Sequence, residues 1–179
     1  MLRRSPLAAL LLIVLLALTA GCASGVRPSA MVPQDFSVAV QSSRSVHASV
    51  SGADETDPMW GSQLSSSAFH EALVAAIQRS GVFATVVSGP EADYQLRVRL
   101  VDLDQPFAGF NMTVGLTCKW TLVNEATGDS VMEATITSEH TAKVGDSLVG
   151  VKRLRIAREG AARENIREGI ERVSRLTLD

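Results

Sequence analysis

The feature that most constrains the fold is a pair of alternating segments over residues 113–138. In the first segment apolar side chains occupy every second position, with threonines, a glycine and a lysine between them. A period of two is typical of a strand with one buried and one exposed face. A short polar stretch with Gly128 separates it from a second alternating segment. The pattern predicts an antiparallel hairpin with Cys118 and Trp120 on its buried face.

Other segments add strands and two helices. Alternation predicts further strands at residues 36–41, 46–50 and 94–100, and β-branched residues predict a short strand at 82–87. Apolar residues at spacings of three and four predict helices over 64–77 and 152–176, and Gly81 suits a left-handed exit from the first. This order predicts an α+β fold, a two-layer sandwich of a mostly antiparallel sheet of about four or five strands with two helices on one face.

The first residues have the three parts of a secretory signal peptide. Arg3 and Arg4 precede an apolar run over 7–18, which is too short to span a membrane, and small residues follow. The sequence Leu-Thr-Ala-Gly-Cys ending at Cys22 resembles the lipobox of bacterial lipoproteins. That resemblance implies cleavage after residue 21 and acylation of the Cys22 thiol. A plain signal peptide with a chance cysteine is the alternative.

The remaining chain divides into a tether and one domain. Residues 22–34 are small, polar and broken by Pro28 and Pro33, which predicts a flexible tether. Residues 35–179 are long enough for one domain with a single core. Ala23 stands where an aspartate marks inner-membrane retention in proteobacterial lipoproteins. The resemblance therefore favours the periplasmic side of the outer membrane, with the membrane bound through the N-terminal lipid.

Charge and residue content argue against nucleic-acid binding, a disulfide and a metal site. Loss of Arg3 and Arg4 with the signal leaves 15 basic and 19 acidic residues, a balance that argues against nucleic-acid binding. The chain has two cysteines, so acylation of Cys22 leaves Cys118 without a disulfide partner, and we expect it in the core. The three histidines show no metal-ligand spacing. We expect no metal and no cofactor.

One tetrapeptide raises an enzymatic alternative. Residues 145–148 read Gly-Asp-Ser-Leu, the signature of the GDSL esterases, with Ser147 in the place of the nucleophile. In that family the serine block lies early and an Asp-x-x-His pair lies late, whereas here no histidine follows the block. A serine without a base is a poor nucleophile. The other interpretation is a turn that leads into the last helix.

Two segments are candidate partner surfaces. Phe107 and Phe110 lie in a glycine-bearing loop, where they predict either a contact surface or a lid folded under the sheet. The last helix is rich in arginine. Arg163 and Arg167 either belong to a solvated face with paired glutamates or bind an anionic partner such as lipopolysaccharide phosphates or an acidic protein.

The element order also resembles small Gram-negative lipoproteins. The helix ending at Gly81, the following strands, the hairpin and the last helix are similar in order to the LPS-assembly lipoprotein, the N-terminal module of TolB and the curli-secretion lipoprotein. The resemblance implies a non-catalytic binding or assembly accessory with an envelope protein or LPS as partner. The alternatives are an esterase using Ser147 and a purely structural envelope protein.

Overall fold

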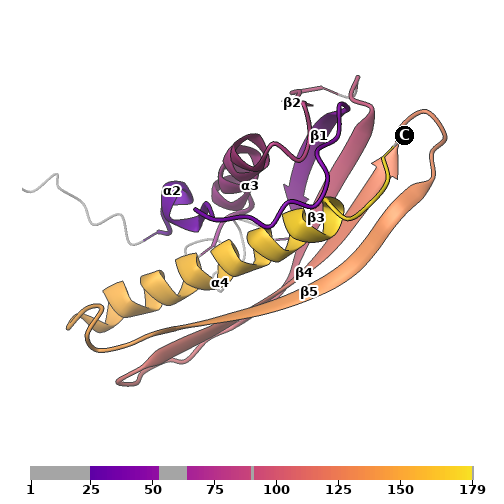
Figure 1. The fold of residues 1–179 in the computed structure, drawn as a ribbon. Coiled ribbons are helices and arrows are strands. Elements are labelled where there is room, and N and C mark those ends of the chain that lie inside the picture. Colours follow the sequence, from indigo (N-terminus) through magenta and orange to yellow (C-terminus); the bar gives the residue numbers. More distant parts are fainter. Residues whose placement is uncertain (1–24, 53–63, 90, 179) are drawn as a thin grey trace, which may run out of the picture.

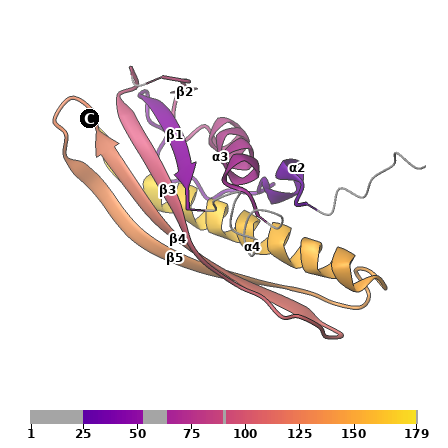
Figure 2. The ribbon, with the colours of Figure 1, turned by 180° about the vertical axis from the view of Figure 1, so that it is seen from behind.

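A five-stranded sheet with helices on one face forms the domain (Figure 1). The computed structural model describes residues 25–52, 64–89 and 91–178. Along the chain these form α2 (Pro28–Met31), β1 (Ser45–Ser51), α3 (Ser66–Ser80), β2 (Thr85–Val86), β3 (Tyr94–Asp104), β4 (Met112–Asn124), β5 (Ser130–Ala142) and α4 (Gly150–Val173). Viewed from behind, the other face of the sheet carries no helix among these residues (Figure 2). The predicted α+β two-layer architecture is confirmed.

The strands lie in the order β2-β1-β3-β4-β5. The predicted hairpin is confirmed and longer than expected, because β4 and β5 pair from Met112 and Ala142 to Val123 and Ser130. β3 pairs antiparallel with β4, while β1 pairs parallel with both β2 and β3. β1 and β2 are parallel because α3 is a crossover connection: it carries the chain back to the end of the sheet where β1 starts, so that β2 runs in the same direction as β1.

The predicted strand over 36–41 is wrong. These residues run along the end of α4, and their hydrogen bonds go to that helix. The Val40 N–H donates to the Ser174 carbonyl at 3.0 Å, and the Ser37 N–H donates to the Glu171 carboxylate at 3.1 Å. A segment whose partners lie on a helix has no neighbouring strand, so its alternation reflects packing rather than sheet pairing.

The predicted flexible tether over 22–34 needs correction from residue 25 onward. Met31 and Val32 are buried, and Pro28 lies in the first turn of α2, where its missing N–H costs nothing. The Arg27 guanidinium donates to the Glu159 carboxylate at 3.0 and 3.1 Å, which raises the pKa of Arg27. Arg163 donates to the Ala30 carbonyl at 2.8 Å. Apolar burial and these contacts fix the segment on the domain.

Helix α3 forms in the predicted region but runs from Ser66 to Ser80, and Gly81 provides the predicted exit. The Ser65 hydroxyl accepts the Ala68 N–H at 3.1 Å, and this N-cap satisfies one of the open donors of the first turn. Gly81 leaves the helix at a φ of 66°. Its buried residues, among them Phe69 and Leu73, face the sheet.

Helix α4 packs on β4 and β5 through a polar contact inside the core. The Trp120 indole donates to the Asn165 side chain at 3.0 Å, and Asn165 donates to the Ile136 carbonyl at 3.0 Å. The Ser138 hydroxyl donates to the Ala161 carbonyl at 2.9 Å. Asn165 is fully buried, so these bonds offset the cost of burying an amide. The network fixes both the position and the rotation of the helix.

Gly169 lets α4 approach the Trp120 ring. A Cβ at residue 169 would lie 2.4 Å from two ring atoms of Trp120, which is itself fully buried. Trp120 is on the buried face, as its place in the alternating pattern predicts. The close approach of helix and indole therefore requires a glycine at this position.

We expect Gly169→Ala to destabilise the domain by about 1–3 kcal/mol, since the added methyl overpacks a rigid ring. The better helix propensity of alanine recovers at most about 1 kcal/mol. Urea denaturation measures the change. Gly145→Ala is the control, because a Cβ at residue 145 has no atom within 4 Å. Equal stability of the two variants would contradict the close packing.

Candidate functional site

Five large apolar side chains are exposed together at one end of the domain. Phe107 and Phe110 lie in the loop between β3 and β4, and Phe107 is fully exposed while Phe110 is 84% exposed. Leu148, Val149 and Val151 lie where β5 turns into α4, each more than 60% exposed. We call these five residues the apolar tip. The contact-surface interpretation of the two phenylalanines is favoured over the lid, because neither packs on the core.

Arg153 joins the two loops that carry the apolar tip. Its guanidinium donates to the Ser147 carbonyl at 2.7 Å and to the Gly109 carbonyl at 3.1 Å. The side chain is 7% exposed, and its Nε has no hydrogen-bond partner among the described residues. A buried cation that binds carbonyl groups from two loops holds both in place, since removing it leaves those acceptors unsatisfied.

A second arginine fixes the start of the same loop. Arg158 lies one and a half turns further along α4, and its Nε donates to the Gln105 side chain at 2.8 Å. Burial lowers the pKa of Arg158. The loop that carries Phe107 and Phe110 is therefore tied to α4 at Gln105 and at Gly109.

A shallow groove separates the two loops. It has a volume of about 360 Å³ and is lined by Phe107, Ala108, Gly109, Met112, Gly150, Val151, Arg153 and Leu154. Most of these side chains are apolar, and the Arg153 guanidinium is the charged group among them. The arrangement suits an amphiphilic partner with an apolar part and an anionic part.

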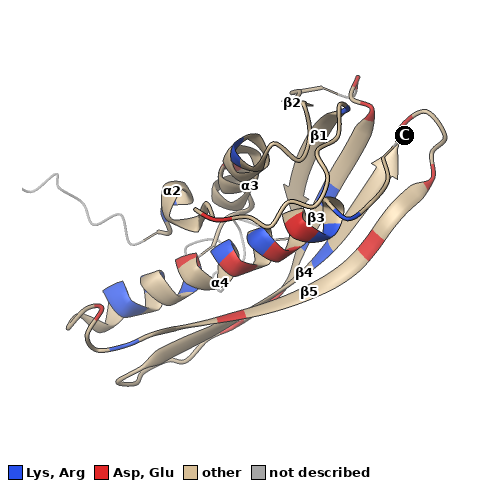
Figure 3. Cartoon of the chain, viewed as in Figure 1, with Lys and Arg blue, Asp and Glu red and all other residues tan. Residues whose placement is uncertain are grey.

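Positive charge surrounds the apolar tip. The first two turns of α4 carry Lys152, Arg153 and Arg155, and the first turn has no acidic residue. Lys143 directly follows β5, and Figure 3 shows basic positions after β5 and at the start of α4 at the same end of the domain. The N-terminus of a helix is itself positive, so basic residues there add to its field. Asp146 is the acidic residue of the intervening turn, and its carboxylate accepts the Lys143 N–H at 2.7 Å.

Ser147 lies in that turn without the surroundings of a nucleophile. Its hydroxyl accepts the Val149 N–H at 3.2 Å, and its carbonyl binds Arg153. His140, the histidine nearest to it in sequence, packs instead against Gly160, ten residues into α4. Within the described ranges, no histidine forms a hydrogen bond with Ser147. The geometry favours the turn interpretation of the tetrapeptide.

The two predicted arginines lie away from the apolar tip. Arg163 binds the Ala30 carbonyl and so holds the N-terminal segment rather than a partner. Arg167 is exposed and forms an ion pair with Glu164. Glu168 and Arg172 form an ion pair at 2.6 Å, and Glu159 pairs with Arg27 and Arg155. The middle and end of α4 therefore form a paired face. The structure does not join Arg163 and Arg167 to Phe107 and Phe110 in one site.

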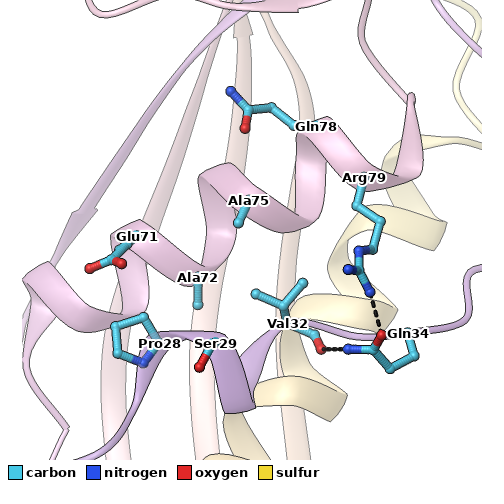
Figure 4. A pocket seen from close by; sticks show the side chains of 9 residues that line it. All are labelled: Pro28, Ser29, Val32, Gln34, Glu71, Ala72, Ala75, Gln78 and Arg79. Atoms are coloured by element: carbon cyan, nitrogen blue, oxygen red, sulfur yellow. Dashed lines mark hydrogen bonds between the residues drawn. The ribbon is translucent and has the colours of Figure 1, made fainter.

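A second hollow of about 300 Å³ lies between α2 and α3 (Figure 4). Ala72 and Ala75 turn towards it, while Gln78 points away. The Arg79 guanidinium donates to the Gln34 side chain, which in turn donates to the Val32 carbonyl at 3.3 Å. Arg79 and Gln34 are thus engaged with each other, and we assign no chemistry to this hollow.

The other predicted features have simple outcomes. Cys22 lies outside the described residues. Cys118 is fully buried in the core, and burial raises the pKa of its thiol strongly. No group of three His, Cys, Asp or Glu side chains is placed to hold a metal ion in the described part of the chain.

No helix over residues 25–52, 64–89 and 91–178 is long and apolar enough to cross a membrane.

Comparison with known proteins shows the fold. No family model matches this sequence, and no curated protein is significantly similar to it. Protein XCC0632 from Xanthomonas campestris has a TM-score of 0.61 at 18% identity, over 82% of this chain and 89% of that one. The hypothetical protein CT253 from Chlamydia trachomatis has a TM-score of 0.56 at 10% identity, over 74% and 96%. The fold is therefore shared with bacterial proteins of very different sequence.

Arg153 and the apolar residues beside Ser147 belong to the site although the sequence did not predict them as site residues. Leu148, Val149 and Val151 were visible as apolar residues in a predicted loop, a pattern that indicates either burial or contact. The role of Arg153 depends on two loops that are far apart in the sequence, so no local pattern could indicate it.

We expect Arg153→Met to loosen both loops, since the change removes two hydrogen bonds from a charged donor and keeps much of the aliphatic bulk. Amide hydrogen exchange over 107–110 and 147–149 should become faster by about tenfold or more. Lys152→Met is the control, because Lys152 is exposed beside it. Unchanged exchange in the Arg153 variant would show that the loops hold their shape without the arginine.

Proposed function

We propose that this chain is a lipid-anchored, non-catalytic binding or assembly accessory of the bacterial envelope, on the periplasmic side of the outer membrane. The sequence that ends at Cys22 supports the anchor. The observation that carries the binding role is the apolar tip, which Arg153 holds in place at one end of an otherwise well-packed domain.

Several features support binding over catalysis. The Ser147 hydroxyl is engaged by the Val149 N–H, and the groove beside the apolar tip is shallow and mostly apolar. Exposed aromatic and aliphatic groups contribute binding energy by leaving water, whereas catalysis needs polar groups that converge on a reacting atom. The apolar tip supplies exposed apolar groups, whereas the described residues around it do not supply polar groups that converge on one point.

Membrane fractionation tests the anchor. In the wild type we expect labelled palmitate to enter the protein at Cys22 and the protein to stay with the membranes. Cys22→Ser should abolish the label and release the protein into the soluble periplasmic fraction. Cys118→Ser is the matched control and should keep both label and location, because that thiol lies in the core. A wild type without palmitate would exclude the anchor.

Ester hydrolysis tests the absence of catalysis. We expect the purified protein to hydrolyse nitrophenyl esters at the rate of the buffer, and Ser147→Ala to leave both this rate and the melting temperature unchanged. Wild-type hydrolysis that disappears in Ser147→Ala would restore the esterase alternative.

A further inference from the structure

The start of the domain and the apolar tip lie towards the same end of the molecule. The N-terminal segment runs beside α4 in the direction of that helix. Arg27 contacts Glu159, Ala30 contacts Arg163, Ser37 contacts Glu171 and Val40 contacts Ser174. Going back along the chain therefore leads towards the start of α4, where the apolar tip lies. In both ribbon views α2 lies nearer to that end than the β4–β5 turn does (Figures 1 and 2).

Cys22 can reach the level of the apolar tip. Glu159 lies nine residues after Gly150, which corresponds to about 14 Å along α4. Cys22 lies five residues before Arg27, and five extended residues span up to about 17 Å. Because the chain is fixed to the domain from Val26 onward, an acyl anchor on Cys22 has little slack. The end of the domain that carries the apolar tip is therefore held close to the membrane.

The charges at this end complement an anionic surface. Lys143, Lys152 and Arg153 surround the apolar tip, and Asp146 is the acidic residue of its turn. Among the described residues, Asp104 and Glu139 flank Gly115 on the open face of the sheet. Exposed apolar groups ringed by basic residues match the interface of a bilayer, where acyl chains lie beneath anionic headgroups.

We propose that the apolar tip inserts into the bilayer that holds the Cys22 anchor and that its basic residues bind anionic phospholipid headgroups. This inference rests on the proposed lipid anchor and adds a second membrane contact to it. With both contacts the domain has a fixed orientation. The β4–β5 turn lies at the far end of the sheet, and the open face of the sheet stays accessible to partners.

A dye at the apolar tip tests the insertion. The acylated protein with Phe107→Cys is labelled with an environment-sensitive fluorophore, and buried Cys118 does not compete for the reagent. Ala126→Cys, in the exposed β4–β5 turn, is the matched control. In vesicles of phosphatidylcholine with phosphatidylglycerol we expect a blue shift and an intensity gain of about twofold or more at residue 107 and none at residue 126.

Charge reversal tests the headgroup contact. Adding phosphatidylglycerol to phosphatidylcholine vesicles should increase the response of the dye at residue 107. Lys143→Glu combined with Lys152→Glu should abolish this increase. Arg175→Glu, exposed beyond the other end of α4, should leave it intact. An equal dye response in both lipids with wild-type charges would overturn the anionic contact.

The outcomes separate this proposal from the anchor itself. A protein that carries palmitate and floats with vesicles, while the dye at residue 107 stays in water, keeps the anchor and overturns the insertion. If palmitate is absent, the Cys22→Ser chain labelled at residue 107 is titrated with the same vesicles to high lipid concentration. A saturating dye shift supports insertion without the anchor, and the absence of any shift overturns it. A dye shift that grows with protein concentration without vesicles assigns the apolar tip to a second copy and overturns the proposal.

Discussion

The contact between α4 and the β4–β5 hairpin is the constraint on which the rest of the structure depends. Trp120 fills the space beneath Gly169, and its indole donates to Asn165, which also binds the backbone of β5. A buried amide with several partners tolerates few other positions, so the helix has one depth and one rotation. That rotation directs Glu159 and Arg163 towards the N-terminal segment and Arg153 towards the two end loops. One core contact therefore sets the position of both the N-terminal segment and the loops of the apolar tip.

Much of the fold follows from local pattern. The period of two over β3 and β4 predicts which residues are buried, and the structure buries Leu116, Cys118 and Trp120 accordingly. The slip of phase after Leu100 indicates the bulge that is present there. Capping at Ser65 and the exit at Gly81 are also local. These features are predictable because each depends on residues within a few positions of one another.

The N-terminal segment shows where local pattern fails. Residues 25–34 read as a tether because they are small and contain prolines, but Met31 and Val32 have a hydrophobic place between α3 and α4. Arg27 is anchored by Glu159, which lies 132 residues away in the sequence. The candidate site has the same property. The exposure of Phe107 and Phe110 could be proposed from the sequence, whereas their fixation by Arg153 depends on tertiary contacts.

The charge distribution within α4 separates structural from functional arginines. In the middle and at the end of the helix, Arg155, Arg167 and Arg172 face Glu159, Glu164 and Glu168. The first turn of the helix carries no acid, although an acid there would interact favourably with the helix dipole and neutralise the charge of Arg153. A carboxylate beside Arg153 would leave its bonds to the two carbonyl groups in place and cancel its positive charge. The described structure keeps the carbonyl contacts without that carboxylate, so Arg153 shapes the apolar tip and no acid in the first turn of α4 neutralises its charge.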